Sequence, residues 1–139
     1  MLLLKLPLVR YCGYCCTAHF KEVQNKVRKE LRDILQDKPS QIGDLPKLPY
    51  TEATLAEVAR IRSLFPLGFP HYTTDDVCVE NVKIPKNTVI MPFLWAIYMD
   101  PKVWRNPEEF CPERFLNDEG KFFQPESFLP FQAGKIGVL

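Results

Sequence analysis

The chain has 139 residues, of which 18 are basic and 17 acidic, and its formal net charge is +1. This balance gives no electrostatic argument for nucleic-acid binding, because proteins that bind nucleic acids carry basic patches or stripes. Hydrophobic residues make up 46% of the sequence, which is typical of a globular chain and favours a core over disorder.

The N-terminal stretch, MLLLKLPLVR, is apolar but is interrupted by Lys5 and Pro7. It is much shorter than the ~20 residues of a membrane span, and it makes a poor signal peptide. We therefore expect residues 1–18 to be a leader outside the fold, without a convincing membrane anchor.

Cysteines are clustered in this leader, at Cys12, Cys15 and Cys16. A single Cys-x-x-Cys pair is weak evidence for zinc, because a structural zinc site takes four ligands, so the role of these cysteines stays open. Cys78 and Cys111 bring the number to five. An odd number without the spacing of a disulfide framework indicates free thiols in a reducing compartment.

A first helix is predicted from His19 to about Gln36. Its apolar residues recur at spacings of four, four and three, which places them on one face: Val23, Val27, Leu31 and Ile34. Charged residues fill the other face, which we interpret as a solvated surface.

A second helix is predicted from about Thr51 to Phe65. Thr54 and Glu57 have the spacing of a capping box near its start. The prolines and glycine of FPLGFP end it.

The hydrophobic period changes between His71 and Phe93. Runs of β-branched residues lie on both sides of PKNT, and Asn87 tolerates a positive φ, so we predict two strands around this turn. Asp100 and Pro101 then have the order of a helix cap and first helical residue, which predicts a short helix.

A long irregular loop follows from Pro107, rich in proline and phenylalanine. Together, these elements predict a mainly α fold with a small β part. The α+β arrangement contains two main helices, a β-hairpin, a short helix and this loop.

Glu57 and Arg60 lie three residues apart on the second predicted helix. This spacing alone usually means an exposed ion pair of little energetic value. Arg114 lies in the irregular loop, within the sequence PERF. If the loop folds back on the helix, both guanidiniums can satisfy a buried Glu57 carboxylate.

The ordered motifs resemble the C-terminal half of a cytochrome P-450, a haem-thiolate monooxygenase, and most closely the microsomal type. The resemblance covers about Phe20 to Lys135, which implies a partial domain over residues 19–135 and an unmatched tail over 136–139. The motifs that carry it are Glu57-x-x-Arg60, Pro107-x-x-Phe110-x-Pro112-Glu113-Arg114-Phe115 and Phe128-x-Pro130-Phe131-x-x-Gly134.

The resemblance implies roles for individual residues. Glu57, Arg60 and Arg114 would be a structural triad that holds the loop before the haem. His71 would donate to a haem propionate, although a surface histidine at the start of a strand is an even alternative. Residues 67–69 would lie near the substrate cavity. Phe131 and Gly134 would lie at the start of the haem-binding loop.

Two positions depart from the family pattern Phe-x-x-Gly-x-Arg-x-Cys-x-Gly. Ile136 stands where the arginine is expected, and Val138 stands where the axial cysteine is expected. Valine has no donor atom for haem iron, whose thiolate ligand favours O–O cleavage in this class. Cys111 and Cys78 are poor substitutes, because ligation requires a fixed position and supporting contacts.

We therefore expect no catalytic ligand within the chain and no activity of the chain alone. The oxygen-activating helix of the family is not found before Phe20 either. The alternatives to a monooxygenase segment are a truncated non-catalytic isoform, a pseudogene product or an incomplete gene model.

Partners and location follow from the resemblance alone. They are haem, an NADPH-dependent reductase, a small lipophilic substrate and the endoplasmic reticulum membrane. In the family, an N-terminal segment that this sequence does not match makes the membrane attachment. Nothing in the sequence indicates which substrate is used.

Overall fold

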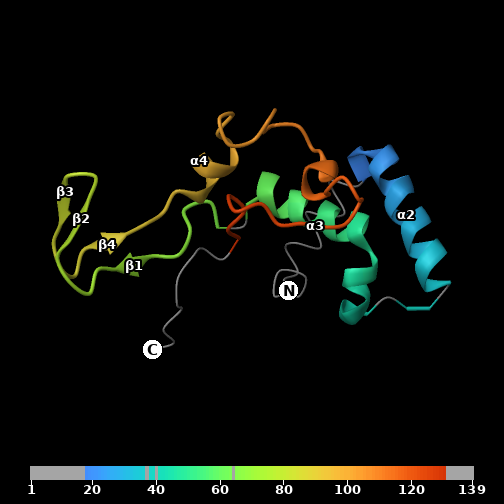
Figure 1. Cartoon of the computed structure of the whole chain (residues 1–139), viewed down its shortest axis with the longest axis horizontal. Coiled ribbons are helices and arrows are strands. Elements are labelled where there is room, and N and C mark those ends of the chain that lie inside the picture. Colours follow the sequence, from blue (N-terminus) through green and yellow to red (C-terminus); the bar gives the residue numbers. More distant parts are fainter. Residues whose placement is uncertain (1–17, 37, 40, 64, 131–139) are drawn as a thin grey trace.

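The structure is a computed structural model that describes residues 18–36, 38–39, 41–63 and 65–130. The described residues form a helical body and a β arm that extends from it (Figure 1). The predicted α+β fold class is confirmed. Several predictions lie outside the described residues, namely those on the leader with its cysteines, Phe131, Gly134, Ile136 and Val138.

The first helix, α2, spans Lys21–Leu35. It ends at Gln36, whose backbone is left-handed (φ 46°) and whose N–H donates to the Arg32 carbonyl. Val23 is the buried residue of the predicted apolar face, whereas Ile34 is 42% exposed. Little apolar area therefore attaches α2 to the body, and its charged residues contribute more than the sequence indicated.

The second helix, α3, spans Pro49–Ile61 and follows the 3-10 helix η2, Ile42–Lys47. It begins two residues before the predicted Thr51 and ends four before Phe65. Pro49 occupies the first turn, where its missing N–H costs nothing. The predicted capping box is wrong, because the Thr54 hydroxyl donates to the Tyr50 carbonyl at 2.8 Å.

Instead, a carboxylate from α2 caps α3. Glu30 Oε1 accepts from the Tyr50 N–H at 2.8 Å, and Oε2 accepts from the Thr51 N–H at 2.7 Å and the Thr51 hydroxyl at 2.6 Å. These N–H groups have no partner inside the helix, and a negative charge at a helix N-terminus is stabilising.

The β arm contains four strands: β1 His71–Tyr72, β2 Val77–Val79, β3 Val82–Ile84 and β4 Val89–Ile90. β1 pairs antiparallel with β4, and β2 with β3. The predicted hairpin around PKNT is therefore wrong, because the strands flanking it have other partners. The tight turn lies at Glu80 and Asn81, whose φ angles of 47° and 71° match the two positive values of a two-residue hairpin turn.

Thr73 joins the inner and outer parts of the arm. Its hydroxyl donates to the Pro85 carbonyl at 2.7 Å and accepts from the Thr88 N–H at 2.9 Å. Thr73 is also the buried residue of the arm, at 8% exposure, among strand residues that are mostly exposed. The arm therefore has almost no apolar core of its own.

The short helix α4 spans Leu94–Tyr98, so the prediction of a helix starting at Asp100 is wrong. Asp100 instead forms a single turn, in which its carboxylate accepts from the Lys102 N–H at 2.8 Å and its carbonyl from the Trp104 N–H at 2.9 Å. Aspartate favours such local turns by binding its own backbone two residues on.

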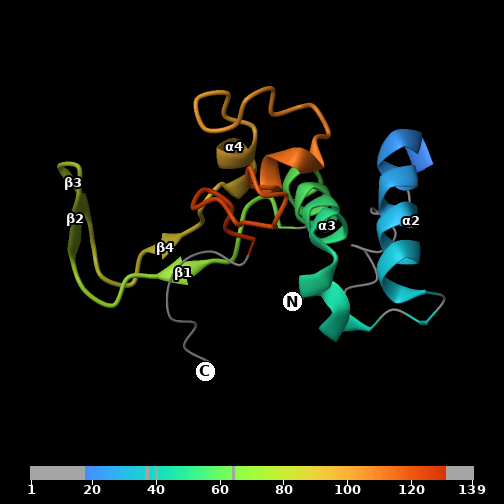
Figure 2. The same ribbon diagram turned by 45° about the vertical axis from the view of Figure 1, so that its right-hand side comes forward.

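The core lies where the irregular loop folds back on α3. The 3-10 helix η3, Pro112–Phe115, contacts α3, and both views place it against that helix (Figures 1 and 2). Small residues of α3 allow this close approach, and aromatic rings fill the remaining space. The core consists of Ala53, Ala56, Ala59, Leu94, Tyr98, Trp104, Phe115 and Phe128. Among the described helices, none is long and apolar enough to cross a membrane.

Candidate functional site

Glu57 lies at the centre of the helical body and is fully buried. Its Oε2 accepts from Arg60 Nε at 2.7 Å, and its Oε1 accepts from Arg60 Nη2 at 2.9 Å. Oε1 also accepts from Arg114 Nε at 3.1 Å and from the Cys111 N–H at 3.0 Å. The structure thus brings the three predicted residues together in one cluster, the buried triad of Glu57, Arg60 and Arg114.

Arg60 is fully buried and uses its remaining N–H groups on backbone carbonyls. Nη1 donates to Tyr98 O at 2.8 Å, and Nη2 donates to Pro107 O at 2.7 Å and to Glu109 O at 3.4 Å. A guanidinium has five donors in a fixed fork, so Arg60 can hold α3, α4 and the loop at once.

Arg114 has a 12% exposed side chain and binds the same loop. Nη1 donates to Arg105 O at 2.9 Å, and Nη2 donates to Asn106 O at 3.3 Å and Glu109 O at 3.2 Å. These carbonyls have no regular secondary structure to satisfy them. The guanidiniums therefore act as the hydrogen-bonding partners of a loop that has no ladder of its own.

The buried triad contains two positive charges and one negative charge. A buried charge is tolerated only when it is paired and hydrogen-bonded. The carboxylate forms a bidentate pair with Arg60, and the dipoles of the loop carbonyls face the surplus positive charge. This arrangement can fix a loop in place, because the fully buried Glu57 carboxylate accepts four hydrogen bonds, from Arg60, Arg114 and the Cys111 N–H.

Two aromatic side chains of the core lie beside the triad. Arg60 Cζ is 5.2 Å from the ring centroid of Trp104, within the range of a cation–π contact. Burial raises the pKa of the Tyr98 hydroxyl to about 12. The neighbouring Leu129 N–H lowers this pKa slightly but does not reach hydrogen-bond geometry with the hydroxyl, so Tyr98 Oη has no partner among the described residues.

The Cys111 thiol is half-buried and donates to Glu113 Oε2 at 3.6 Å. Burial raises the pKa of this thiol, and the Glu113 charge raises it further despite Arg114 nearby. Because the thiolate is the metal-binding form, Cys111 is a poor iron ligand. Cys78 lies exposed on β2, in the arm.

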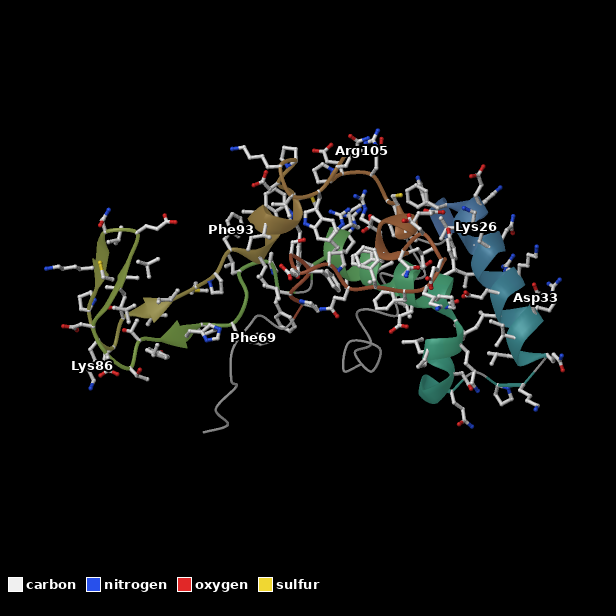
Figure 3. All side chains as sticks on the ribbon, viewed as in Figure 1. Lys26, Asp33, Phe69, Lys86, Phe93 and Arg105 are labelled. Carbon is white, nitrogen blue, oxygen red and sulfur yellow. The ribbon has the colours of Figure 1, made fainter. Side chains whose placement is uncertain are left out.

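The structure does not bring His71 to the triad. His71 lies exposed on β1 and pairs in register with Ile90 of β4. Phe69 precedes this strand and packs against Phe65 with the two rings tilted, their centroids 4.6 Å apart. Figure 3 shows Phe69 and Phe93 where the arm joins the body and Lys86 in the outer part of the arm, where the chain turns from β3 to β4.

Several partners of the site were missed by the sequence. The backbone carbonyls that accept from Arg60 and Arg114 have no sequence signature, because every residue carries one. Lys26 of α2 was assigned to a solvated surface, yet its Nζ donates to Glu113 at 2.7 Å. The adjacency of Glu113 to the predicted Arg114 was the available signal for this pair.

Comparison with known proteins gives one consistent family. A family model for cytochrome P450 matches residues 14–136. Cytochrome P450 2U1 from Rattus norvegicus is 42% identical over 114 residues, which is 81% of this chain and 22% of the relative.

Two human relatives agree. Cytochrome P450 2U1 from Homo sapiens is 40% identical over 115 residues, which is 82% of this chain and 21% of the relative. Cytochrome P450 2D6 from Homo sapiens is 40% identical over 119 residues, which is 85% of this chain and 24% of the relative. The chain therefore spans less than a quarter of the length of these relatives.

Proposed function

The chain belongs to the cytochrome P450 family, and from this we propose that it supplies part of the scaffold that positions haem in a monooxygenase. The observation that carries the proposal is the buried Glu57 carboxylate, bound by Arg60 and Arg114. These contacts fix the loop that runs to residue 130, after which the family resemblance places the haem-binding loop. The scaffold would comprise residues 19–135.

The described residues do not fit an iron–thiolate centre by themselves. Cys78 is far out on the arm, and the pKa of Cys111 is raised. No group of three or more His, Cys, Asp or Glu side chains in the described part of the chain is arranged to hold a metal ion. In our proposal Val138 occupies the position of the axial ligand, so the chain alone does not form a thiolate-ligated haem.

The remaining roles in this proposal come from the family. Haem would supply oxygen activation in the complete site, with His71 donating to a propionate and Phe131 and Gly134 opening the haem-binding loop. An NADPH-dependent reductase would supply electrons, and one oxygen atom of O2 would enter a small lipophilic substrate at the endoplasmic reticulum membrane. The part played by the described residues is to hold the loop rigid.

A second candidate is a non-catalytic member of the family. Val138 and Ile136, at the expected cysteine and arginine positions, favour it. A carbon monoxide difference spectrum of the reduced chain mixed with haem tests the argument from Val138, on which both candidates depend. We expect no thiolate-type band, and observing one would overturn the argument from Val138.

The scaffold role is tested by Arg114→Ala with limited proteolysis of the 139-residue chain. Hydrogen bonds to charged groups contribute about 1.5–3 kcal/mol each, so losing those of Arg114 should speed cleavage between residues 110 and 130 by more than about tenfold. Arg105→Ala is the matched control, because the carbonyl of Arg105, not its exposed side chain, binds Arg114. Unchanged protease resistance of Arg114→Ala would contradict the scaffold role.

A further inference from the structure

A second polar cluster, the outer cluster of Lys26, Tyr50 and Glu113, lies on the solvent side of η3. Glu113 Oε1 accepts from Lys26 Nζ at 2.7 Å and from Tyr50 Oη at 3.2 Å. These three residues come from α2, α3 and η3, so one carboxylate joins the three elements. Figure 3 shows Lys26 at the end of α2 that lies next to η3.

One face of α2 contacts Tyr50 both at its ring and at its backbone N–H. Lys26 Nζ lies 5.3 Å from the centroid of the Tyr50 ring, and Glu30, one turn further along α2, accepts from the Tyr50 N–H. Residues four apart on a helix lie on the same face. Tyr50 of α3 therefore contacts both α2 and η3, so the position of η3 over α3 depends on the position of α2.

The protonation states suit these hydrogen bonds. Burial raises the pKa of Glu113, but the hydrogen bond and charge of Lys26 outweigh it, so the net pKa is below its ordinary value. The hydrogen bond to Glu113 raises the pKa of Lys26. Burial, with the charge of Glu113, raises the pKa of Tyr50 to about 12. At neutral pH the cluster thus contains an ammonium, a carboxylate and a neutral phenol.

The buried triad and the outer cluster are joined at Cys111, the residue that precedes η3. The Cys111 N–H donates to Glu57 of the buried triad, and the Cys111 thiol donates to Glu113 of the outer cluster. Cys111 and η3 are therefore bound to α3 through the buried Glu57 carboxylate and to α2 through the exposed Glu113 carboxylate.

We propose that Glu113 is a positioning residue for the loop that leads to the haem site, acting with Lys26 and Tyr50. The inference rests on the proposed scaffold function. The Lys26 and Glu113 side chains are 57% and 46% exposed, and exposed ion pairs add little to global stability. Their effect is local, on where the turn of η3 sits over α3.

Trp104 provides a direct probe of this position. It is 4% exposed, and its ring centroid lies 5.7 Å from that of Phe115, the last residue of η3. The sequence contains two tryptophans, so a Trp95→Phe background leaves Trp104 as the single tryptophan, whose emission is selected by exciting beyond the absorption of tyrosine. The η3 amides of Arg114 and Leu116, which donate to Cys111 O and Glu113 O, give a second readout by hydrogen exchange.

The experiment compares Glu113→Gln and Lys26→Met in this background, using the 139-residue chain. We expect stronger acrylamide quenching of Trp104 and about two- to fivefold less protection of the two amides, the fold-change that corresponds to an exposed ion pair. The urea midpoint should barely move. The double variant should change quenching and protection no more than either single variant does. Lys26→Arg, which keeps the positive charge, should retain the wild-type signals.

Lys121→Met is the matched control, because it removes an exposed 2.8 Å ion pair with Glu119 on the same loop without contacting α2. If it changes the Trp104 signals as much as Lys26→Met, or if Lys26→Met changes nothing, the positioning role is wrong. Haem takes no part in these readouts. A failure of the scaffold function in the Arg114→Ala test is therefore distinguishable from a failure of this inference.

Discussion

The helical body and the β arm satisfy the hydrogen-bonding groups of their backbone in different ways. In the body, guanidiniums of Arg60 and Arg114 bind the loop carbonyls and are themselves held by one buried carboxylate. In the arm, short ladders and the hydroxyl of Thr73 make the equivalent contacts, while most strand residues stay exposed. The body therefore depends on buried charges for its structure, whereas the arm does not.

This difference has an energetic consequence. Removing one member of a buried, paired set leaves the others charged and desolvated, which is far more costly than losing an exposed contact. Substitutions in the body should therefore have large effects on global unfolding. Substitutions in the arm should have small ones.

The largest effect is expected for Glu57→Gln. The amide keeps the shape but removes the charge between two guanidiniums, so we expect a loss of about 3–5 kcal/mol in the free energy of unfolding. Urea denaturation followed by circular dichroism measures it. Glu119→Gln, which lies on the exposed part of the loop, should cost almost nothing. A Glu57→Gln chain as stable as wild type would show that the buried charge does not stabilise the body.

A smaller effect is expected for Glu30→Ala, at the edge of the body. It deletes the cap of α3 and should cost about 0.5–2 kcal/mol, the range of other lost helix caps. Asp33→Ala on the same helix is the control, because Asp33 is exposed and the variant likewise replaces a carboxylate by alanine. Equal losses for the two variants would mean that the cap contributes nothing.

The smallest effect on the body is expected for Thr73→Val in the arm. The variant loses both hydrogen bonds of the hydroxyl, so exchange protection of the Thr88 amide should fall about fivefold or more. The urea midpoint of the body should stay within error. A large shift of that midpoint would contradict this expectation and show that the arm and the body unfold as one cooperative unit.

The sequence predicted the parts of the fold that depend on local pattern. Both main helices were found from hydrophobic periodicity, and the α+β class followed. The start of α3 was misplaced because its cap comes from Glu30, a residue about twenty positions earlier whose role depends on tertiary structure. The hairpin was misplaced because Glu80 takes a positive φ that its residue type does not suggest.

The candidate site was predictable in part for the same reason. Glu57 and Arg60 share a helix, so their proximity follows from spacing, whereas Arg114 required the loop to fold back. The ordered family motifs supplied that expectation, which spacing alone did not. The partners that complete the site are backbone carbonyls and the ion pair of Lys26 with Glu113, and no residue pattern predicts them.

The guanidinium contacts also constrain the length of the loop. Arg60 reaches carbonyls at Tyr98, Pro107 and Glu109 from one planar group. Loops on protein surfaces usually tolerate inserted or deleted residues, but one added residue between Tyr98 and Pro107 would shift the later carbonyls away from the fork. Length variation in relatives should therefore be rarer in this segment than in the β arm, although the segment has less regular secondary structure.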